Sequence, residues 1–206
     1  MFDFSGKTVL VTGGAQGIGK ETVKGVVEGG GHAVILDINE EVGKATAAEV
    51  GNCSFYKIDL GSSENIRAVM AQVLADFDRV DVLINVGGVI SKAPFEEISD
   101  AEWERTLRIN LTGPFTTCSA IYPYFKEKKG GRIVNVSSVA GKIGGGLLGT
   151  AAYASSKAGV NGLTKAIAKE GGKYGISCNA VCPSFTMTSM TRTLAEDAEK
   201  SAKVIG

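Results

Sequence analysis

The residues best suited to chemistry are a tyrosine and a lysine in the segment YASSK. Tyr153 and Lys157 are four positions apart, so a helix would place the phenol and the ammonium on one face. A free tyrosine has a pKa near ~10 and is a poor base at neutral pH, but a nearby cation favours the phenolate. The pair is therefore suited to proton transfer, although this spacing is also found in ordinary surface pairs on helices.

A glycine-rich segment near the N-terminus, KTVLVTGGAQGIGK at residues 7–20, is typical of an anion-binding turn. Residues 9–11 predict a buried strand, the following glycines permit a sharp turn, and a helix is expected from near Ile18. The free N–H groups and the positive dipole end of that helix would point at a phosphate in the turn. A tight turn without any ligand is the alternative.

Two classes of nucleotide could fit this turn. Residues 14–20 match the first seven positions of the P-loop of ATP- and GTP-binding proteins, but Glu21 stands where that loop needs Ser or Thr for magnesium. The glycines at positions 13, 17 and 19 instead form G-x-x-x-G-x-G, a variant of the dinucleotide-binding pattern G-x-G-x-x-G. The glycine turn alone leaves both alternatives open.

An acidic residue after the second apolar run favours the dinucleotide. Asp37 follows the expected strand 33–36 and stands close to the ~20-residue offset at which a carboxylate meets the ribose hydroxyls of NAD. The same carboxylate would repel the 2′-phosphate of NADP. Asp37 could instead cap, together with Asn39, the helix expected over residues 40–50.

Composition excludes several classes of protein. Acidic and basic residues balance at 22 each, so no excess charge indicates nucleic acid or anionic lipid as a partner. No apolar stretch reaches the ~20 residues that span a bilayer, and the run after Asp3 is too short for a signal peptide. We therefore expect a cytoplasmic protein that binds neither nucleic acid nor membrane.

Cysteine and histidine usage argues against a metal site. The four cysteines lack the paired spacing of a zinc site, and we expect them to be reduced packing residues. The single histidine, His32, follows three glycines at a turn. With no second histidine, a His-dependent triad elsewhere or a His-rich metal site is excluded, so acid–base chemistry must come from another residue type.

Apolar runs alternate with amphipathic runs along the whole chain, and no repeat or linker divides its 206 residues. We expect a single α/β domain with a doubly wound parallel sheet of the Rossmann type, in the order 3-2-1-4-5-6. The glycine turn and Asn85 would then flank one crevice. The expected strands are 9–11, 33–36, 53–58, 82–84, 132–136 and 176–181; the expected helices are 18–28, 40–50, 64–77, 99–110, 114–128 and 152–171, with a break at Gly113-Pro114 and a loop over 141–149.

These motifs, in this order, resemble the short-chain dehydrogenase/reductase family over nearly the whole chain. The resemblance implies an NAD(P)-dependent oxidoreductase that interconverts a secondary alcohol and a ketone by hydride transfer. A catalytically inactive nucleotide-binding or regulatory protein on the same fold is the alternative. The matching motifs are T-G-x-x-x-G-x-G at residues 12–19, Asp59, residues 85–88, Asn110, Ser138, the Tyr153/Lys157 pair and residues 183–188.

The resemblance also implies a role for each catalytic residue. Tyr153 would act as general acid or base, and Lys157 would hold the nicotinamide ribose and lower the tyrosine pKa. Ser138 would hydrogen-bond the substrate oxygen. Asn110 would help to position a water between Lys157 and solvent.

For the cofactor, Asp37 and Gln16 favour NAD over NADP, because relatives that use NADP often carry a basic residue in the glycine turn. Asp59 and Leu60 would border the adenine, while Thr186 and Thr188 would hold the nicotinamide amide. The full set of expected cofactor contacts is Gly13, Gln16, Gly17, Ile18, Gly19, Asp37, Asp59, Leu60, Asn85, Tyr153, Lys157, Pro183, Thr186 and Thr188.

The chain departs from the family pattern in three places. Val86 and Gly87 stand where N-A is usual, which is expected to loosen the hydrogen bonding between the middle strands, and Ser184 replaces a glycine. Family members usually continue into a further helix and a seventh strand, whereas this sequence stops inside the segment that resembles a substrate lid, residues 187–206. We expect a further segment of the natural protein, or another element, to cover the sixth strand.

Substrate and assembly are only outlined by the sequence. Residues 143–148 with Ile90, Met187 and Met190 suggest an apolar pocket, and hence an uncharged, moderately hydrophobic alcohol or ketone as the small-molecule partner. The resemblance implies a homodimer or homotetramer paired through the helices at 114–128 and 153–171.

Overall fold

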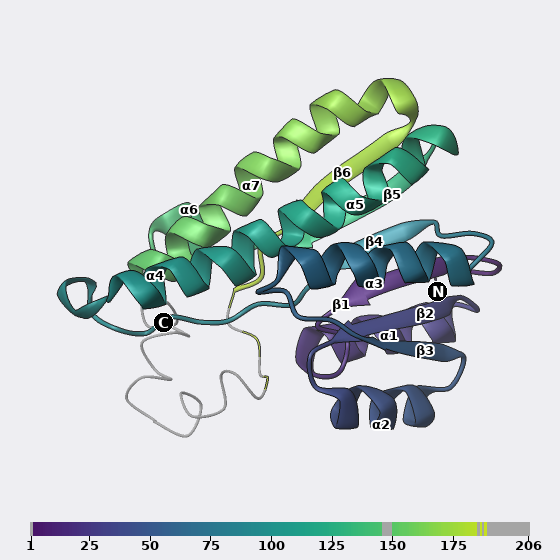
Figure 1. Ribbon diagram of the computed structural model, residues 1–206, viewed down its shortest axis with the longest axis horizontal. Coiled ribbons are helices and arrows are strands. Elements are labelled where there is room, and N and C mark those ends of the chain that lie inside the picture. Colours follow the sequence, from purple (N-terminus) through teal and green to yellow (C-terminus); the bar gives the residue numbers. More distant parts are fainter. Residues whose placement is uncertain (1, 146–149, 185, 187, 189–206) are drawn as a thin grey trace.

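A six-stranded parallel sheet forms the centre of the protein (Figure 1). The computed structural model describes residues 2–145, 150–184, 186 and 188. The strand order is β3-β2-β1-β4-β5-β6, which confirms the predicted order. The strands are β1 (Thr8–Thr12), β2 (His32–Asp37), β3 (Cys53–Lys57), β4 (Val82–Asn85), β5 (Gly131–Val136) and β6 (Ile176–Val181).

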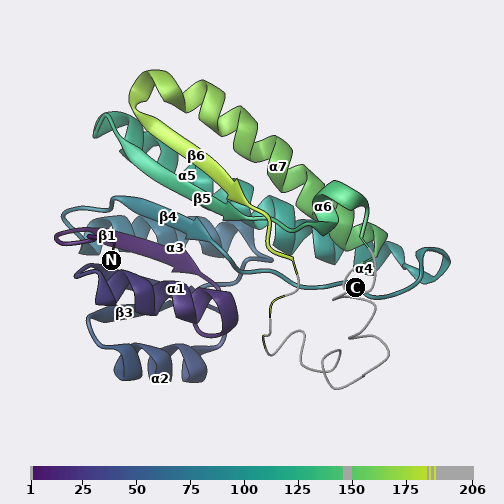
Figure 2. The same ribbon diagram turned by 180° about the vertical axis from the view of Figure 1, so that it is seen from behind.

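Helices cover the two faces of the sheet unequally. Helices α3, α5 and α7 pack on one face and α1 and α2 on the other, as the two opposite views show (Figures 1 and 2). Among the described residues, nothing comparable covers β5 and β6 on the second face, where Val181 is 52% exposed. The helices are α1 (Gly17–Glu28), α2 (Glu40–Val50), α3 (Ser63–Asp76), α4 (Asp100–Leu107), α5 (Gly113–Glu127), α6 (Ala140–Ile143) and α7 (Ala151–Gly171).

The core is divided by the sheet into two apolar clusters. Strand residues alternate between them: Leu10 and Val34 face the cluster under α3 and α5, whereas Val9 and Val11 face α1. Strands buried on both faces read as continuous apolar runs, and this is why their positions could be predicted from the sequence.

Two local predictions were wrong. The expected break at Gly113-Pro114 is absent, because α4 passes through a π-helical turn, Arg108–Thr112, directly into α5. Pro114 lies in the first turn of α5, where its missing N–H has no helical partner to lose. The expected loop over 141–149 begins with the short helix α6, and residues 146–149 lie outside the described part of the chain.

Candidate active site

The glycine turn after β1 is a place where the backbone needs glycine. Gly13 and Gly17 have φ angles of 67° and 56°, in the left-handed region that disfavours side chains. A Cβ on Gly13 would lie 2.6 Å from the Cα of Gly87, and a Cβ on Gly19 would overlap the carbonyl of Gly13. The turn therefore brings three stretches of backbone together and leaves the N-terminus of α1 open above them.

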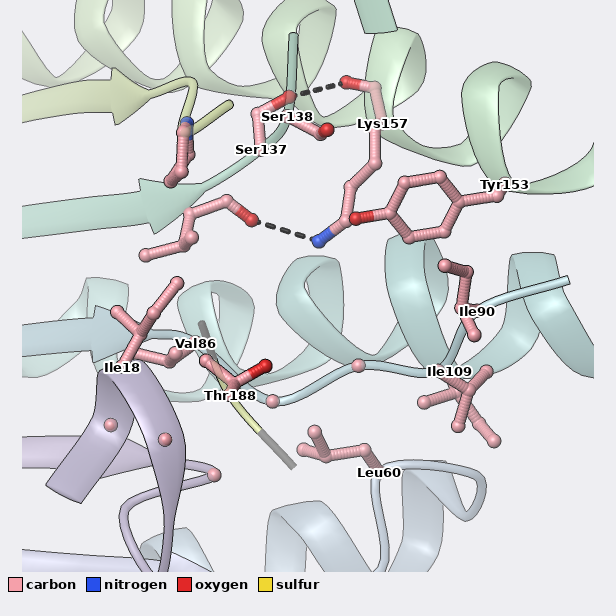
Figure 3. A pocket seen from close by; sticks show the side chains of 18 of the residues that line it. Ile18, Leu60, Val86, Ile90, Ile109, Ser137, Ser138, Tyr153, Lys157 and Thr188 are labelled. Atoms are coloured by element: carbon pink, nitrogen blue, oxygen red, sulfur yellow. Dashed lines mark hydrogen bonds between the residues drawn. The ribbon is translucent and has the colours of Figure 1, made fainter. Parts of the chain in front are cut away.

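A cavity of about 960 Å³ lies at the carboxyl ends of the strands, beside this turn (Figure 3). It has the position expected for a ligand site in a doubly wound sheet. All predicted catalytic and cofactor-binding residues line it except Asn85 and Asn110. Arg105 and Ile109 also line it and were not predicted as site residues.

Asp37 ties the end of β2 to the glycine turn. Its carboxylate accepts hydrogen bonds from the N–H of Ala15 at 3.1 Å and from the N–H of Asn39 at 3.0 Å. The cap of α2 is Asn39, whose side chain accepts from the N–H of Val42, so Asp37 does not serve as the helix cap. A carboxylate has about four acceptor sites, which leaves capacity for a ligand hydroxyl.

Asp59 and Leu60 follow β3 on the same side of the cavity. Asp59 folds back onto its own turn, since its carboxylate accepts from the N–H of Gly61 at 2.8 Å. The side chain of Asn65 in α3 accepts from the N–H of Asp59 at 2.7 Å and fixes the turn from outside. Asn65 was not singled out in the sequence, because its partner is a backbone group.

Tyr153 and Lys157 lie on one turn of α7 and face the cavity (Figure 3). The Nζ of Lys157 is 5.7 Å from the centre of the Tyr153 ring and donates to the carbonyl of Val136 at 2.9 Å. Lys157 is only 5% exposed, and this burial lowers its pKa to about 8. Burial also raises the pKa of Tyr153, while a hydrogen bond with Ser138 lowers it. In the protein without ligands the phenol is therefore protonated at neutral pH.

The end of β5 holds Lys157 at two points. Val136 accepts from its ammonium, and the next residue, Ser137, donates its hydroxyl to the backbone carbonyl of Lys157 at 2.9 Å (Figure 3). Ser138 follows, with its hydroxyl accepting from the N–H of Ala140 at 3.1 Å. Gly141 completes the arrangement, because a Cβ there would lie 2.7 Å from the backbone of Lys157. The contacts of Ser137 and Gly141 with α7 could not be predicted from the sequence pattern.

Asn110 is fully buried in the π-helical turn between α4 and α5, and it does not line the cavity. Its side chain accepts from the N–H of Val89 and donates to the carbonyl of the same residue, both at 2.8 Å, and also donates to Ser156 at 3.1 Å. A Cβ on Gly88 would lie 2.9 Å from Asn110 and 3.6 Å from the ammonium of Lys157. Only glycine leaves the space between these two side chains open.

Asn85 is also buried, at 3% exposed, and its side chain belongs to a polar network between the middle strands and the helices. It donates to Asn135 at 2.9 Å and accepts from Thr117 at 2.8 Å, and Asn135 donates in turn to Thr164 at 2.9 Å. The hydroxyl of Thr12 accepts from the N–H groups of residues 86 and 87. With valine and glycine at these two positions, the middle strands are tied together by Thr12 and by the network of Asn85.

The cysteines and the single histidine lie outside the cavity lining. The four cysteines are free, with Cys118 and Cys178 buried in the core and Cys53 and Cys182 half-buried. His32 contacts the side chains of Asn52 and Ser54 at 3.1 and 3.0 Å, away from the cavity. In the part of the chain that the structure describes, no group of acidic, His and Cys side chains could hold a metal, and no helix is long and apolar enough to cross a membrane.

Part of the expected substrate side lies outside the described residues. This holds for Met187, Met190 and the predicted lid over 187–206, of which the structure describes only Thr188. Pro183, Thr186 and Thr188 line the cavity, together with Ser184. Ile90 and Ile143 also line it and add apolar side chains to its wall.

The chain is similar in sequence to known dehydrogenases and reductases, and in structure to a protein solved with NADP. The chain is 36% identical to D-threitol dehydrogenase from Mycolicibacterium smegmatis over 195 residues, which cover 92% of this chain and 74% of the relative. It is 36% identical to 3-oxoacyl-[acyl-carrier-protein] reductase FabG from Thermotoga maritima over 201 residues, which cover 96% of this chain and 81% of the relative. The Pseudomonas aeruginosa RhlG/NADP active-site complex has a similar structure, with a TM-score of 0.89 and 29% identity, over 97% of this chain and 80% of that one.

The family model described as short chain dehydrogenase matches residues 7–199. This match spans the glycine turn, the sheet and the Tyr153/Lys157 helix. The protein is thus an oxidoreductase that acts on CH–OH donors with a nicotinamide cofactor, and it belongs to the short-chain dehydrogenase/reductase family.

Proposed function

We propose that the protein interconverts a secondary alcohol and a ketone with NAD, and that Tyr153 transfers the proton. The observation that carries this proposal is the meeting of Tyr153, Lys157 and Ser138 at one end of the cavity whose other end is the glycine turn. The proposed substrate is uncharged and moderately hydrophobic, in keeping with the apolar wall formed by Ile90 and Ile143.

The shape of the cavity fits a dinucleotide. The glycine turn leaves room that a Cβ at Gly17 would reduce, and the N–H groups at the start of α1 are available to a diphosphate. Asp37 stands at one end with acceptor capacity for ribose hydroxyls, while Lys157 stands at the other end with two further donors. When bound, the nicotinamide supplies the hydride acceptor or donor.

The residues of this chain then have separable tasks. Ser138 donates a hydrogen bond to the substrate oxygen and holds it near the phenol. Tyr153 takes the proton from the hydroxyl of an alcohol, or gives one to the oxygen of a ketone. The ammonium of Lys157 holds the ribose and favours the phenolate, because it brings positive charge into a site where burial alone raises the pKa of Tyr153.

Asn110 contributes to the site by holding the loop after β4 and the helix α7 in place. Its side chain is occupied by Val89 and Ser156, so any part in leading a proton from Lys157 to solvent would run through its backbone and a water. We also assign the cofactor contacts predicted at Gln16, Asp59 and Leu60 to the adenosine and diphosphate end, and those at Thr186 and Thr188 to the nicotinamide amide. For Asn85, the backbone that follows β4 would make the contact, because the side chain is buried in the network.

Turnover with a panel of cyclic and linear secondary alcohols, with NAD reduction followed by absorbance, tests the function directly. Replacing Tyr153→Phe removes the proton-transferring hydroxyl and should lower kcat by at least ~100-fold. NAD affinity should stay within about twofold, since the other contacts remain. A fully active variant would contradict the role of Tyr153, and a wild-type protein that binds NAD without turning over any alcohol would support the regulatory alternative.

A preference for NAD over NADP is supported by the charges around the cavity. Asp37 is anionic at the adenosine end, and the only cationic side chains among the described lining residues are Arg105 and Lys157. The variant Asp37→Asn removes the charge and keeps an acceptor oxygen for only one of the two N–H groups, Ala15 or Asn39, that the carboxylate holds. Without the charge, the ratio of NADP to NAD affinity should rise about 10-fold or more. Calorimetric titration with both cofactors measures this ratio, and an unchanged ratio would show that Asp37 does not set the preference.

Neither relative identifies the substrate of this protein, since their names specify two different compounds, D-threitol and a 3-oxoacyl-[acyl-carrier-protein].

For assembly, we propose pairing of two copies through the outer faces of α5 and α7, as a homodimer or within a homotetramer. Phe115 on α5 is 49% exposed and would be covered by such pairing. Size-exclusion chromatography with light scattering tests the pairing, and a monomer would contradict it.

We further propose that residues 1–206 form one domain in which residues 187–206 serve as the substrate lid.

A further inference from the structure

Three polar side chains from distant segments meet beside the catalytic end of the cavity. Ser91 follows the lining residue Ile90 in the loop after β4, Glu102 lies in α4, and Thr150 immediately precedes α7. We propose that this cluster, the Ser91–Glu102–Thr150 link, is a positioning device that fixes the first turn of α7 and hence the hydroxyl of Tyr153. The proposal rests on the proton-transfer role of Tyr153 proposed above.

The link is short and is centred on a buried serine, with Glu102 and Thr150 half-buried. Ser91 is 2% exposed, and its hydroxyl donates to the carboxylate of Glu102 at 2.7 Å. The hydroxyl of Thr150 lies 3.4 Å from that of Ser91, and the N–H of Thr150 donates to the carbonyl of Ser91 at 3.1 Å. A buried hydroxyl bonded to a carboxylate gives a stronger hydrogen bond than a neutral pair. Ser91 is thus held on one side by α4 and holds the start of α7 on the other.

Neither Glu102 nor Thr150 is used in the way that its helix position favours. Ser99 and Glu102 form the sequence of a capping box, and Ser99 does accept from the N–H of Glu102 at 3.2 Å. The reciprocal bond is missing among the described contacts, because the carboxylate of Glu102 turns to Ser91 instead. Thr150 occupies the N-cap position of α7, yet its hydroxyl makes no capping bond. Two side chains suited to capping their own helices therefore both contact Ser91.

The position of the link relative to Tyr153 gives it a function. The carbonyl of Thr150 accepts from the N–H of Ala154 at 2.9 Å, so the turn anchored by Thr150 is the turn that carries Tyr153. On the other side of Tyr153, Asn110 holds Ser156 and Ser137 holds the carbonyl of Lys157. Tyr153 is thus bracketed, and the link is the anchor that precedes it in the chain.

Hydrogen exchange in the protein without substrate or cofactor tests the link independently of turnover. Ser91→Ala removes the bond through which Glu102 fixes Ser91, and with it the fixed position of the Ser91 carbonyl that accepts from the N–H and the hydroxyl of Thr150. Amide exchange in the peptide covering residues 150–157 should therefore become about 10-fold faster. Exchange in β1 and β4 should be unchanged. Ser54→Ala is the control, because it deletes a half-buried serine hydroxyl with one side-chain partner, His32, at the far side of the sheet.

Kinetic measurements then separate positioning from general stability. Ser91→Ala and Glu102→Ala should each lower kcat about 10-fold on the best alcohol found, with NAD affinity unchanged, because a small displacement of a catalytic group has effects of this size. Glu102→Gln keeps an oxygen acceptor for Ser91 and should restore most of the loss. The double variant should be no worse than either single variant, since both remove the same link.

The outcomes distinguish this proposal from the proposed function. Unchanged exchange at 150–157 in Ser91→Ala, or kcat losses that simply add in the double variant, would overturn the link. If the wild-type protein turns over no alcohol while exchange responds as expected, the anchoring of α7 stands and the proton-transfer role of Tyr153 fails.

Discussion

The two ends of the cavity are built from different materials. At the end formed by the glycine turn, the turn after β1 and the chain after β4 meet through backbone, with Gly13 against Gly87 and Gly19 against Gly13. At the end that holds Tyr153 and Lys157, side chains from separate segments hold one another, as when Ser137 bonds the backbone of Lys157 and Asn110 bonds Val89 and Ser156. The first end depends on the lack of Cβ atoms at the glycines, which lets the backbone segments touch. The second end depends on hydrogen bonds that polar side chains make to partners in other segments.

This difference predicts opposite sensitivities. The backbone-built end should tolerate changes of polarity but not the addition of a single Cβ atom, because no flexible side chain can move aside. The end built from side chains should tolerate added volume at its surface but not the loss of one hydrogen-bonding partner, because a buried group left unpaired is costly. Variants at each end test this difference.

The largest effect on cofactor binding is expected from Gly19→Ala at the backbone-built end. The new Cβ would overlap the carbonyl of Gly13, so the turn must shift and its N–H groups would no longer meet a diphosphate. Loss of one or two such charge-assisted bonds corresponds to about 100-fold weaker binding of NADH. A fluorescence titration with NADH measures it.

Gly25→Ala on the same helix is the matched control. A Cβ there meets no atom within 4 Å, so binding should be unchanged and the helix should gain up to ~1 kcal/mol of stability. Equal NADH affinity in the two variants would show that the turn is not built by backbone contact.

The same contrast explains what the sequence could and could not reveal. The glycine turn, Asp37, and the pair Tyr153 and Lys157 are local patterns, so their positions could be predicted without knowing what lies near them. The partners of Asn85 and Asn110 could not, because Asn135 is 50 residues from Asn85 and Val89 is 21 residues from Asn110. Contacts between separate segments follow from packing and leave no periodic signal.

Secondary structure followed the same rule. Strands buried on both faces appeared as apolar runs, and β6 was predicted with its observed bounds, Ile176–Val181. The π-helical turn Arg108–Thr112 was not predicted, because the pair Gly113-Pro114 is typical of a helix break. The turn serves a tertiary contact, since it directs the side chain of Asn110 inward onto Val89. Functional sites are where such departures from local preference are expected.

A smaller loss is expected from Asn135→Leu at the end built from side chains. Asn135 is fully buried between Asn85 and Thr164, and the leucine would leave both without this partner. The free energy of unfolding should fall by about 2 kcal/mol, because Asn85 and Thr164 keep their other partners. Denaturant unfolding measures the loss, and Asn179→Leu on the exposed part of β6 is the control, with an expected change within ~0.5 kcal/mol. A loss below about 1 kcal/mol for Asn135→Leu would mean that the network adds little to stability.

At the end built from side chains, Lys157 should have opposite effects on stability and on activity, because its buried ammonium lowers stability but is needed for turnover. Burial lowers its pKa from 10.5 to about 8, which means that the folded state carries a buried ammonium at a cost of roughly 3 kcal/mol below pH 8. Between about pH 8 and pH 10.5 the unfolded chain binds more protons than the folded one. This contribution to stability therefore rises with pH over that window.

Lys157→Met should abolish turnover and yet stabilise the protein at pH 7, by about 1–2 kcal/mol, because the carbonyl of Val136 loses its donor and offsets part of the gain. The advantage of the variant over the wild type should shrink as pH rises to 10.5, since the wild-type lysine is then neutral in the folded state and about half neutral in the unfolded state. Denaturant unfolding at pH 7 and pH 10 measures the difference, with Lys44→Met, an exposed lysine paired with Glu40, as the control expected to change little at either pH. A variant less stable than the wild type at pH 7 would show that the hydrogen bond to Val136 outweighs the cost of burying the charge.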